Sequence, residues 1–413
     1  GFCGLIACVP IEGATTALPS TPVGFSSAPA APSGFYSSPV MPASNSGVGG
    51  QILDGLTMVT TLGMTYDSNI TQSPGMPVAP VEDDFFLIFG GSLNYRSKAS
   101  ELTFGGDYHG SYNQYFDHTE YSGFSQGADL SANYDLGNLS VAGVFGVNYN
   151  HGANRNYGSE LVDQTTFNSS LSARYRLSPK TSLAGNLSQS LSTSSGDFNE
   201  TQSYDLGASA LWKYSPLTEF GPGVRYTYRS DGTGDGRNSI GPTLSVNYKL
   251  STKVSLNSRV GVDFATYEDG ASADPTLSAS MAIDYRASKL WGMSFSLYRD
   301  TQADPSVSGG YYEVTALRLG YNRKIQRANL NLGINYETTS YSIPAFTGVV
   351  SGSTPIPTAA PDRDYFSLDG SLGMRVLGNT SYASIFMRYN DQSGGGINSW
   401  DAVQTGVSIG RAF

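Results

Sequence analysis

The chain has 413 residues with a formal net charge of −10, and only 14% of its residues are charged. In soluble domains about a quarter of the residues are usually charged, so we expect that much of the surface of this chain does not face water. No apolar run approaches the roughly 18 residues of a membrane-spanning helix, which leaves a closed β-barrel as the way to satisfy backbone groups in lipid. The acidic balance also gives no case for nucleic-acid binding.

The N-terminal part of the chain differs in composition from the rest. Gly1–Val9 is apolar and contains the only two cysteines, Cys3 and Cys8. Three interpretations stay open: a disulfide, lipidation of Cys8 in the lipobox-like Leu5-Ile-Ala-Cys8, or the tail of a signal peptide. Residues 10–50 are rich in Pro, Ala, Ser and Gly, and proline lacks the backbone donor that a strand needs. We therefore expect residues 1–50 to be an extended extension, periplasmic or lumenal, and a candidate plug.

From about Leu56 to the last residue, apolar and polar residues alternate. In one such segment Leu330, Leu332, Ile334 and Tyr336 alternate with asparagine and glycine. Each segment has the period of a strand with one apolar face and the length, about ten residues, of a tilted membrane-spanning strand. Residues 51–413 are therefore predicted to form an all-β fold, a transmembrane antiparallel β-barrel.

The connections between these segments alternate between short and long. The short ones are residues 96–100, 136–138, 178–180, 215–218, 251–253, 287–289, 323–326 and 377–379. The long ones lie near residues 70–83, 113–121, 151–161, 193–201, 230–237, 267–274, 300–309, 342–362 and 391–398. This pattern requires about 18 strands, an even number as in bacterial outer-membrane barrels, with both chain ends on the periplasmic, short-turn side. Loop 342–362 is a candidate inward-folding constriction.

Charges of opposite sign separate onto the two ends of the predicted barrel. The lysines all lie in or near short turns: Lys98, Lys180, Lys213, Lys249, Lys253, Lys289 and Lys324. Acidic residues favour the long loops, as in Glu82-Asp-Asp84 and Glu268-Asp269. A mere preference of charges for turns would not divide the two signs, so the separation indicates real topology.

Two short motifs carry a resemblance to known outer-membrane proteins. The chain ends Val403-Gln-Thr-Gly-Val-Ser-Ile-Gly-Arg-Ala-Phe413. The terminal Phe413, after hydrophobic residues at alternate positions, resembles the signal read by the barrel assembly machinery, from which Arg411 departs. Tyr66-Asp-Ser-Asn69 resembles the first strand of the family named putative β-barrel porin 2. The resemblance implies a barrel from about residue 55 to the end and, for some members, a role in polysaccharide export.

The residues that could carry chemistry do not form a catalytic pattern. His109, His118 and His151 lie toward the loop ends of successive hairpins, where solvated histidines are commoner than a shared metal site. Residues 231–236 are interpreted as a glycine-rich turn, because they lack the full spacing of a calcium loop. The many serines occupy alternating inner-face positions. We predict no enzyme activity, no metal and no cofactor.

Arginine on the polar face is the more informative feature. Continued alternation places nine arginines in the lumen: Arg174, Arg176, Arg225, Arg229, Arg259, Arg286, Arg318, Arg375 and Arg388. Guanidinium groups attract anions and bind carboxylates or phosphates bidentately, as in anion-selective pores. Asp263, Asp284 and Asp369 share this face, so a structural Arg–Asp network that braces the wall is the alternative.

The sequence predicts a passive outer-membrane channel for small polar or anionic solutes. Two other functions stay open: a polysaccharide-export conduit with a periplasmic partner, and a structural barrel that anchors a surface filament or layer. Outer-membrane lipids and the barrel assembly machinery are expected partners, and a homo-oligomer stays open.

Overall fold

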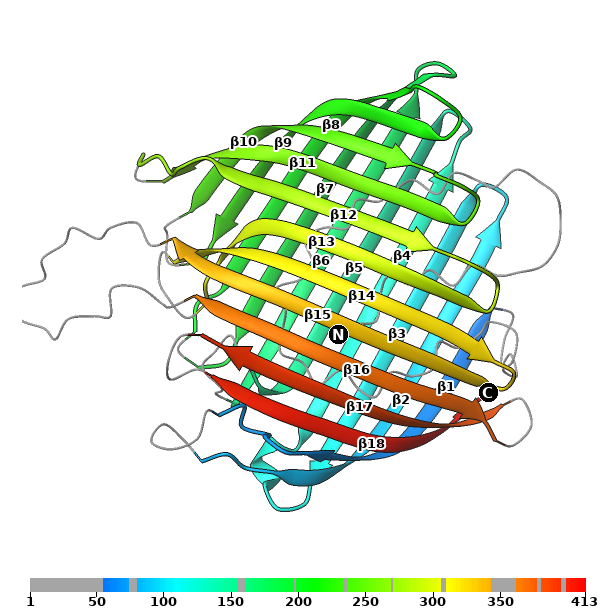
Figure 1. Cartoon of the computed structure of the whole chain (residues 1–413), viewed down its shortest axis with the longest axis vertical. Helices are drawn as coiled ribbons and strands as arrows, with labels where there is room; N and C mark the ends of the chain where they lie inside the picture. The colour runs from blue at the N-terminus through cyan, green and yellow to red at the C-terminus, as the bar shows by residue number, and fades with distance from the viewer. Residues whose placement is uncertain are drawn as a thin grey trace, which may run out of the picture.

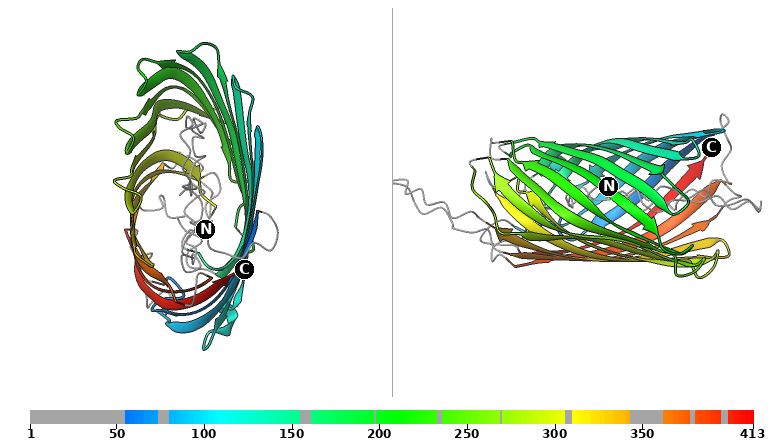
Figure 2. Two further views of the ribbon diagram at one scale, coloured as in Figure 1. Left: turned by 90° about the vertical axis from the view of Figure 1, so that its right-hand side faces the viewer. Right: turned by 90° about the horizontal axis from the view of Figure 1, so that it is seen from above.

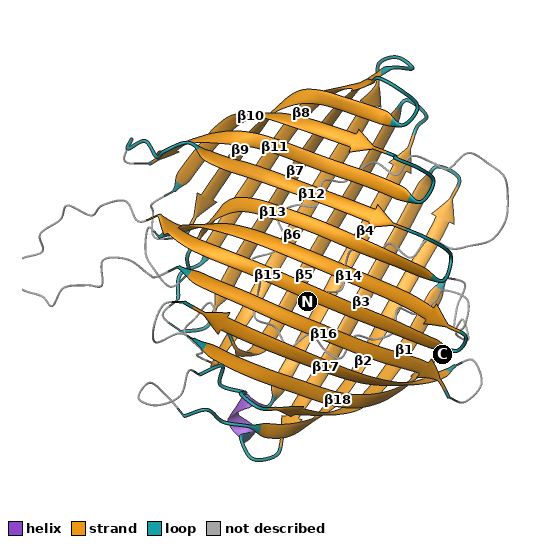
Figure 3. Cartoon of the chain, in the orientation of Figure 1, coloured by secondary structure: helices purple, strands orange, loops and turns teal. Residues whose placement is uncertain are grey.

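The computed structural model describes residues 55–73, 80–154, 161–196, 198–232, 236–268, 270–305, 310–342, 362–376, 380–394 and 399–413. These residues form 18 strands and one short 3-10 helix, η1 (Thr119–Tyr121) (Figure 3). The first nine strands are β1 (Leu56–Asp67), β2 (Asp84–Ala99), β3 (Leu102–Tyr115), β4 (Gly123–Asp135), β5 (Leu139–Ala153), β6 (Leu161–Arg176), β7 (Thr181–Ser194), β8 (Thr201–Lys213) and β9 (Thr218–Ser230). The others are β10 (Arg237–Tyr248), β11 (Val254–Tyr267), β12 (Thr276–Tyr285), β13 (Trp291–Ala303), β14 (Tyr311–Ile325), β15 (Ala328–Ser342), β16 (Arg363–Arg375), β17 (Ser381–Ser393) and β18 (Trp400–Ala412).

The strands close into one barrel (Figure 1). Each strand pairs in antiparallel fashion with the next, and β18 pairs with β1 in the register Val59↔Ala412 to Asp67↔Gln404. Closure removes both free edges of the sheet, which a barrel in lipid requires. The predicted fold class and the count of about 18 strands are confirmed.

In several short turns, a serine side chain accepts hydrogen bonds from backbone N–H groups of the turn. The hydroxyl of Ser178 accepts the backbone N–H groups of Lys180 (3.2 Å) and Thr181 (3.0 Å), and Ser215, Ser251 and Ser288 accept in the same way at their turns. Such side-chain acceptors replace the missing ladder partners of a tight turn. Two predicted turns are displaced, since β2 runs on to Ala99 and β14 to Ile325. Their polar residues belong to strand ends rather than to the turn itself.

Large apolar side chains point outward at alternate positions of the strands. Phe145, Val260 and Leu332 expose 48%, 47% and 44% of their surface, although all three lie mid-strand. The apolar face predicted from the alternation is therefore the outer face. None of the helical residues that the structure describes belongs to a helix long and apolar enough to cross a membrane.

Aromatic side chains form a row at each end of the outer apolar band. At the short-turn end the ring pairs are Tyr95–Phe104 (6.4 Å), Trp212–Phe220 (5.7 Å) and Tyr285–Trp291 (5.4 Å). At the long-loop end, tyrosine hydroxyls donate to acidic groups: Tyr66 to Asp83 (3.1 Å), Tyr228 to Glu268 (3.2 Å) and Tyr336 to Asp364 (3.0 Å). Aromatic rows with one apolar and one polar end are the girdles of a membrane barrel at the two lipid interfaces.

The barrel is flattened rather than round (Figure 2). Seen along its axis, the cross-section is elongated, with the green strands β8 to β10 at one narrow end and red and blue strands near the other. At the first narrow end, Gly221-Pro222 and Gly241-Pro242 stand inside β9 and β10. The ladder to β8 skips from Ser209↔Gly223 to Trp212↔Phe220, and the ladder to β11 skips from Ile240↔Phe264 to Thr243↔Gly261. Glycine and proline mark bends in a sheet, and here they form its corner.

Candidate functional site: the barrel lumen

The inner face of the barrel carries polar side chains at the positions between the outward apolar ones. On β6 the outward residues Leu161, Phe167 and Leu171 alternate with inward Thr166, Asn168 and Ser170. Arg174 continues the inward series. The same parity places Arg225 and Arg229 inside on β9, since Val224 and Tyr226 face outward. The lumen is thus a polar surface with arginines at defined positions.

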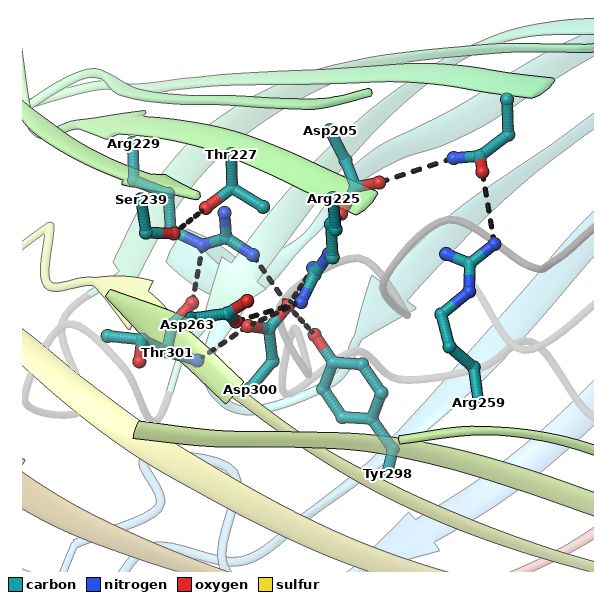
Figure 4. A network of polar contacts seen from close by, with 11 residues as sticks. Asp205, Arg225, Thr227, Arg229, Ser239, Arg259, Asp263, Tyr298, Asp300 and Thr301 are labelled. Atoms are coloured by element: carbon teal, nitrogen blue, oxygen red, sulfur yellow. Dashed lines mark hydrogen bonds and ion pairs between the residues drawn. The ribbon is translucent and has the colours of Figure 1, made fainter. Parts of the chain in front are cut away.

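A buried cluster of charges connects β9 to β13 (Figure 4). Arg225 contacts Asp300 (Nη2–Oδ2 2.6 Å), Asp263 (Nη1–Oδ2 3.3 Å) and Asp205 (Nε–Oδ2 2.5 Å). Arg229 contacts the same Asp300 oxygen (2.6 Å) and donates to the Thr301 carbonyl. Arg225, Arg229 and Asp300 are 8%, 3% and 5% exposed. We call these five charged residues the lumen cluster.

The lumen cluster joins strands that are not neighbours. β9 and β13 are separated by β10, β11 and β12, yet Asp300 of β13 pairs with Arg225 and Arg229 of β9. Within β13, Asp300 also accepts from the Tyr298 hydroxyl (3.0 Å) and the Thr301 N–H (2.9 Å). The corner at β9 and β10 makes this approach feasible, because small residues line it: Ser239, Thr243 and Ser245 are buried on the inner face of β10. Side chains therefore connect two walls at this narrow end.

Further links of this kind lie on both sides of the cluster. Arg259 of β11 donates to Asn186 of β7 (3.0 Å), and Asn186 donates to Asp205 (3.2 Å). Arg174 of β6 pairs with Glu219 of β9, and the Tyr311 hydroxyl of β14 donates to the Arg229 carbonyl (3.2 Å). Side-chain contacts between non-adjacent strands thus extend over the part of the wall from β6 to β14.

The other predicted arginines lie apart from the cluster. Arg318 donates to Asn335 (3.2 Å), and Arg388 stands opposite Asp369 in the register of β16 and β17. Arg176 and Arg286 are exposed and Arg375 is half-exposed at the short-turn end. Asp284 is exposed as well. The structure brings together Arg225, Arg229 and Asp263 but leaves the remaining predicted residues distributed along the lumen.

The three histidines occupy separate places. His109 lies 3.8 Å from Asp107, His118 lies 3.2 Å from Glu82, and His151 contacts Asp163 (Nδ1–Oδ1 2.7 Å). Within the described ranges no group of three or more His, Cys, Asp or Glu residues could hold a metal ion.

The sequence contains two Gly-x-Ser-x-Gly stretches, residues 123–127 and 406–410, which have the spacing of a hydrolase nucleophile motif. Both lie within strands, whereas the hydrolase motif needs a strand–turn–helix elbow. The Ser125 hydroxyl accepts the backbone N–H of His151 (3.4 Å), and the buried His151 Nε2 has no hydrogen-bond partner. Ser125 and His151 therefore do not form a nucleophile–base pair.

The C-terminal Phe413 is tied into the closure of the barrel. Its backbone N–H donates to the Met58 carbonyl of β1 (2.8 Å), and the Arg411 guanidinium lies 5.2 Å from the Phe413 ring centroid. This stacking lets an outward arginine lie near the lipid interface. The predicted features of Cys3, Cys8, residues 10–50 and most of loop 342–362 lie outside the described residues.

Sequence reasoning missed Asp205, Glu219 and Asp300, the acidic partners of the arginines. Asp300 was expected at the start of a long loop, but β13 continues through it to Ala303. The sequence signal that could have indicated these partners is the Gly-Pro pair in each of two consecutive strands, Gly221-Pro222 in β9 and Gly241-Pro242 in β10, because such pairs mark a bend in a sheet. A corner brings inner-face residues of non-adjacent strands together.

The chain is similar to several known proteins at low sequence identity. A family model described as "Putative MetA-pathway of phenol degradation" matches residues 222–351. No curated protein sequence matches the chain. Among solved structures, the chain is similar to OpdK of Pseudomonas aeruginosa, crystallised with vanillate, at 11% identity and a TM-score of 0.41, covering 87% of this chain and 100% of that one. OccAB3 of Acinetobacter baumannii gives the same identity, TM-score and coverage. The FrpB iron transporter of Neisseria meningitidis gives 10% identity and a TM-score of 0.43, covering 87% and 82%.

The location of the protein follows from its own surface. The closed barrel combines an outward apolar band, two aromatic rows, short turns at one end and longer loops at the other. Such a surface is stable only around hydrocarbon, and barrels of this type span bacterial outer membranes. The chain is therefore an 18-stranded antiparallel β-barrel of the bacterial outer membrane.

Proposed function

We propose that the protein is a passive channel for small polar solutes, with a preference for anions. The observation that carries the proposal is a polar lumen whose short-turn end presents cationic side chains on its inner side. Arg176 and Arg375 continue the inner-face series of β6 and β16, and Arg286 follows directly after β12. The lysines Lys180, Lys213, Lys249, Lys253, Lys289 and Lys324 are exposed near the same end.

The proposed selectivity is electrostatic and needs no covalent chemistry. A ring of fixed positive charges raises the local concentration of anions at a pore mouth. The charges of Arg225 and Arg229 contribute less to this field, because Asp205, Asp263 and Asp300 surround them. We therefore assign the preference to the short-turn end rather than to the lumen cluster.

Charge reversal at this end tests the proposal. Wild-type protein in a planar bilayer under a salt gradient should give a steady conductance. Its reversal potential should have the sign that indicates a higher permeability for anions than for cations. The triple change Arg176→Glu, Arg286→Glu and Arg375→Glu should shift the reversal potential in the direction that indicates a higher permeability for cations. Each arginine-to-glutamate change alters the charge by two units, which at about 5 Å from a passing ion in water changes the local ion concentration by roughly 15-fold.

The matched control is Arg323→Glu. Arg323 lies on the outer face at the same end, where it is exposed opposite Trp291 in the register of β13 and β14. Its reversal should leave the selectivity unchanged. A folded wild-type barrel that conducts no ions would contradict the channel and would favour an export conduit or an anchor instead.

A further inference from the structure

The first long loop begins with residues that are buried rather than exposed. Asn69, Ile70, Thr71, Gln72 and Ser73 are 2%, 0%, 8%, 7% and 1% exposed. Loops outside a barrel normally face water, because their backbone groups need partners. The segment Ser68–Ser73, which we call the inner segment, therefore has another location.

Apolar contacts place the inner segment inside the barrel wall. Ile70 packs in a cluster with Phe86, Ile88 and Tyr115. On β2 the outward residues are Phe85 and Phe89, which are 46% and 50% exposed, so Phe86 and Ile88 face the lumen. The Phe86 and Tyr115 rings stack at 4.6 Å between centroids. Ile70 thus anchors the segment to a small apolar patch inside an otherwise polar lumen.

Asn69 fixes the shape of the inner segment. Its Nδ2 donates to the carbonyls of Ser73 (2.9 Å) and Asp401 (3.0 Å), and its Oδ1 accepts from the Thr71 hydroxyl (3.1 Å) and the Ser73 N–H (3.0 Å). Asp67 accepts from the Asn69 N–H (3.0 Å) and from Gln404 (2.8 Å). The Tyr66-Asp-Ser-Asn69 motif therefore ties the segment to β18.

Gln72 extends the inner segment toward a distant strand. Its Nε2 donates to the Ala153 carbonyl at the end of β5 (3.2 Å). β1 and β5 are four strands apart, which corresponds to about 19 Å along the wall at normal strand spacing. Gln72 also has a φ of 51°, a left-handed conformation that few residues other than glycine adopt. Contacts at both ends hold the segment in this conformation.

We infer that the inner segment is a fixed constriction at the long-loop mouth of the channel. This inference rests on the proposed channel function. The segment fills the sector of the mouth in front of β2, β3 and β4, so solutes pass beside it rather than through that sector. Its hydrogen bonds and buried isoleucine make it part of the wall rather than a movable lid.

Single-channel recording of two variants tests the inference. Ile70→Ser removes the apolar anchor, and Gln72→Ala removes the contact to β5. Both should raise the conductance and move the cut-off for polyethylene glycols, added on the long-loop side, to larger polymers. The control is Val314→Ser, which places the same hydroxyl at a 1% exposed inner-face site on β14, away from the segment. It should keep the wild-type conductance and cut-off.

The outcomes separate the inference from the proposed function. Folding of each variant is checked by heat-dependent migration in gels. If wild-type protein conducts and both folded variants match it in conductance and cut-off, the constriction is overturned while the channel stands. If wild-type and all variants are folded and silent, both are overturned. If only the two segment variants conduct, the segment closes the mouth completely, and the passive channel is overturned instead.

Discussion

Replacement of Asp300 by alanine is expected to lower the free energy of unfolding of the barrel by about 3–5 kcal/mol. Asp300 accepts from Arg225, Arg229, Tyr298 and Thr301, and it is only 5% exposed. Its removal leaves two buried guanidinium groups with less compensating charge. Urea titration of the barrel refolded in lipid vesicles, with the folded fraction followed by gel migration, measures the effect.

The control for this change lies on the next strand. Glu313 of β14 pairs with Arg299 of β13 at 2.6 Å, and the Arg299 side chain is 40% exposed. Glu313→Ala removes an ion pair of the same length that is partly exposed on the outer face, where a loss of about 0–1 kcal/mol is expected. Equal losses for the two variants would show that burial of the lumen cluster adds nothing to its strength.

Replacement of Gly241 by alanine is expected to cost about 3 kcal/mol, at the upper end for an overfilled interior. A Cβ atom at Gly241 would overlap the carbonyl oxygen of Val262 in β11, and backbone atoms cannot rotate away as a side chain can. The corner of the barrel would have to open. The yield of heat-modifiable barrel after refolding, together with its urea midpoint, gives the measurement.

Gly185→Ala is the matched control for the corner. A Cβ atom at Gly185 would lie 3.7 Å from the nearest neighbour, the Gly207 carbonyl oxygen, which is an ordinary contact. This variant should refold with a wild-type midpoint. If Gly241→Ala refolds equally well, the close approach of β10 and β11 does not determine the shape of the barrel.

The fold was predictable from the sequence because it depends on local alternation. Leu332, Ile334 and Tyr336 face outward as their period of two requires, and strand number follows from counting such segments. The turns at residues 178–180 and 215–218 were found because a Ser-Pro pair marks each of them. The turn near Ser100 was misplaced, because the polar side chains that precede it belong to the end of β2.

The site was predictable only in part, because its partners depend on the shape of the closed barrel. Parity places Arg225 and Arg229 inside, but it does not reveal that Asp300, 75 and 71 residues farther along the chain, meets them. That contact needs the corner formed by the two Gly-Pro pairs. The inner segment was missed for the same reason, since nothing local in Asn69 or Gln72 indicates a partner on β18 or β5.

The pairing of the first strand with the last has a consequence for biogenesis. Val59 and Ala412 lie near opposite ends of the barrel sequence, so the pairing of β1 with β18 closes a very long loop and is expected to form late. Until then β1 has an open side, and between Leu56 and Tyr66 it carries no lysine, arginine, glutamate or proline to discourage pairing with another chain. We therefore expect a nascent copy released early to present a template for aggregation until β18 pairs with β1.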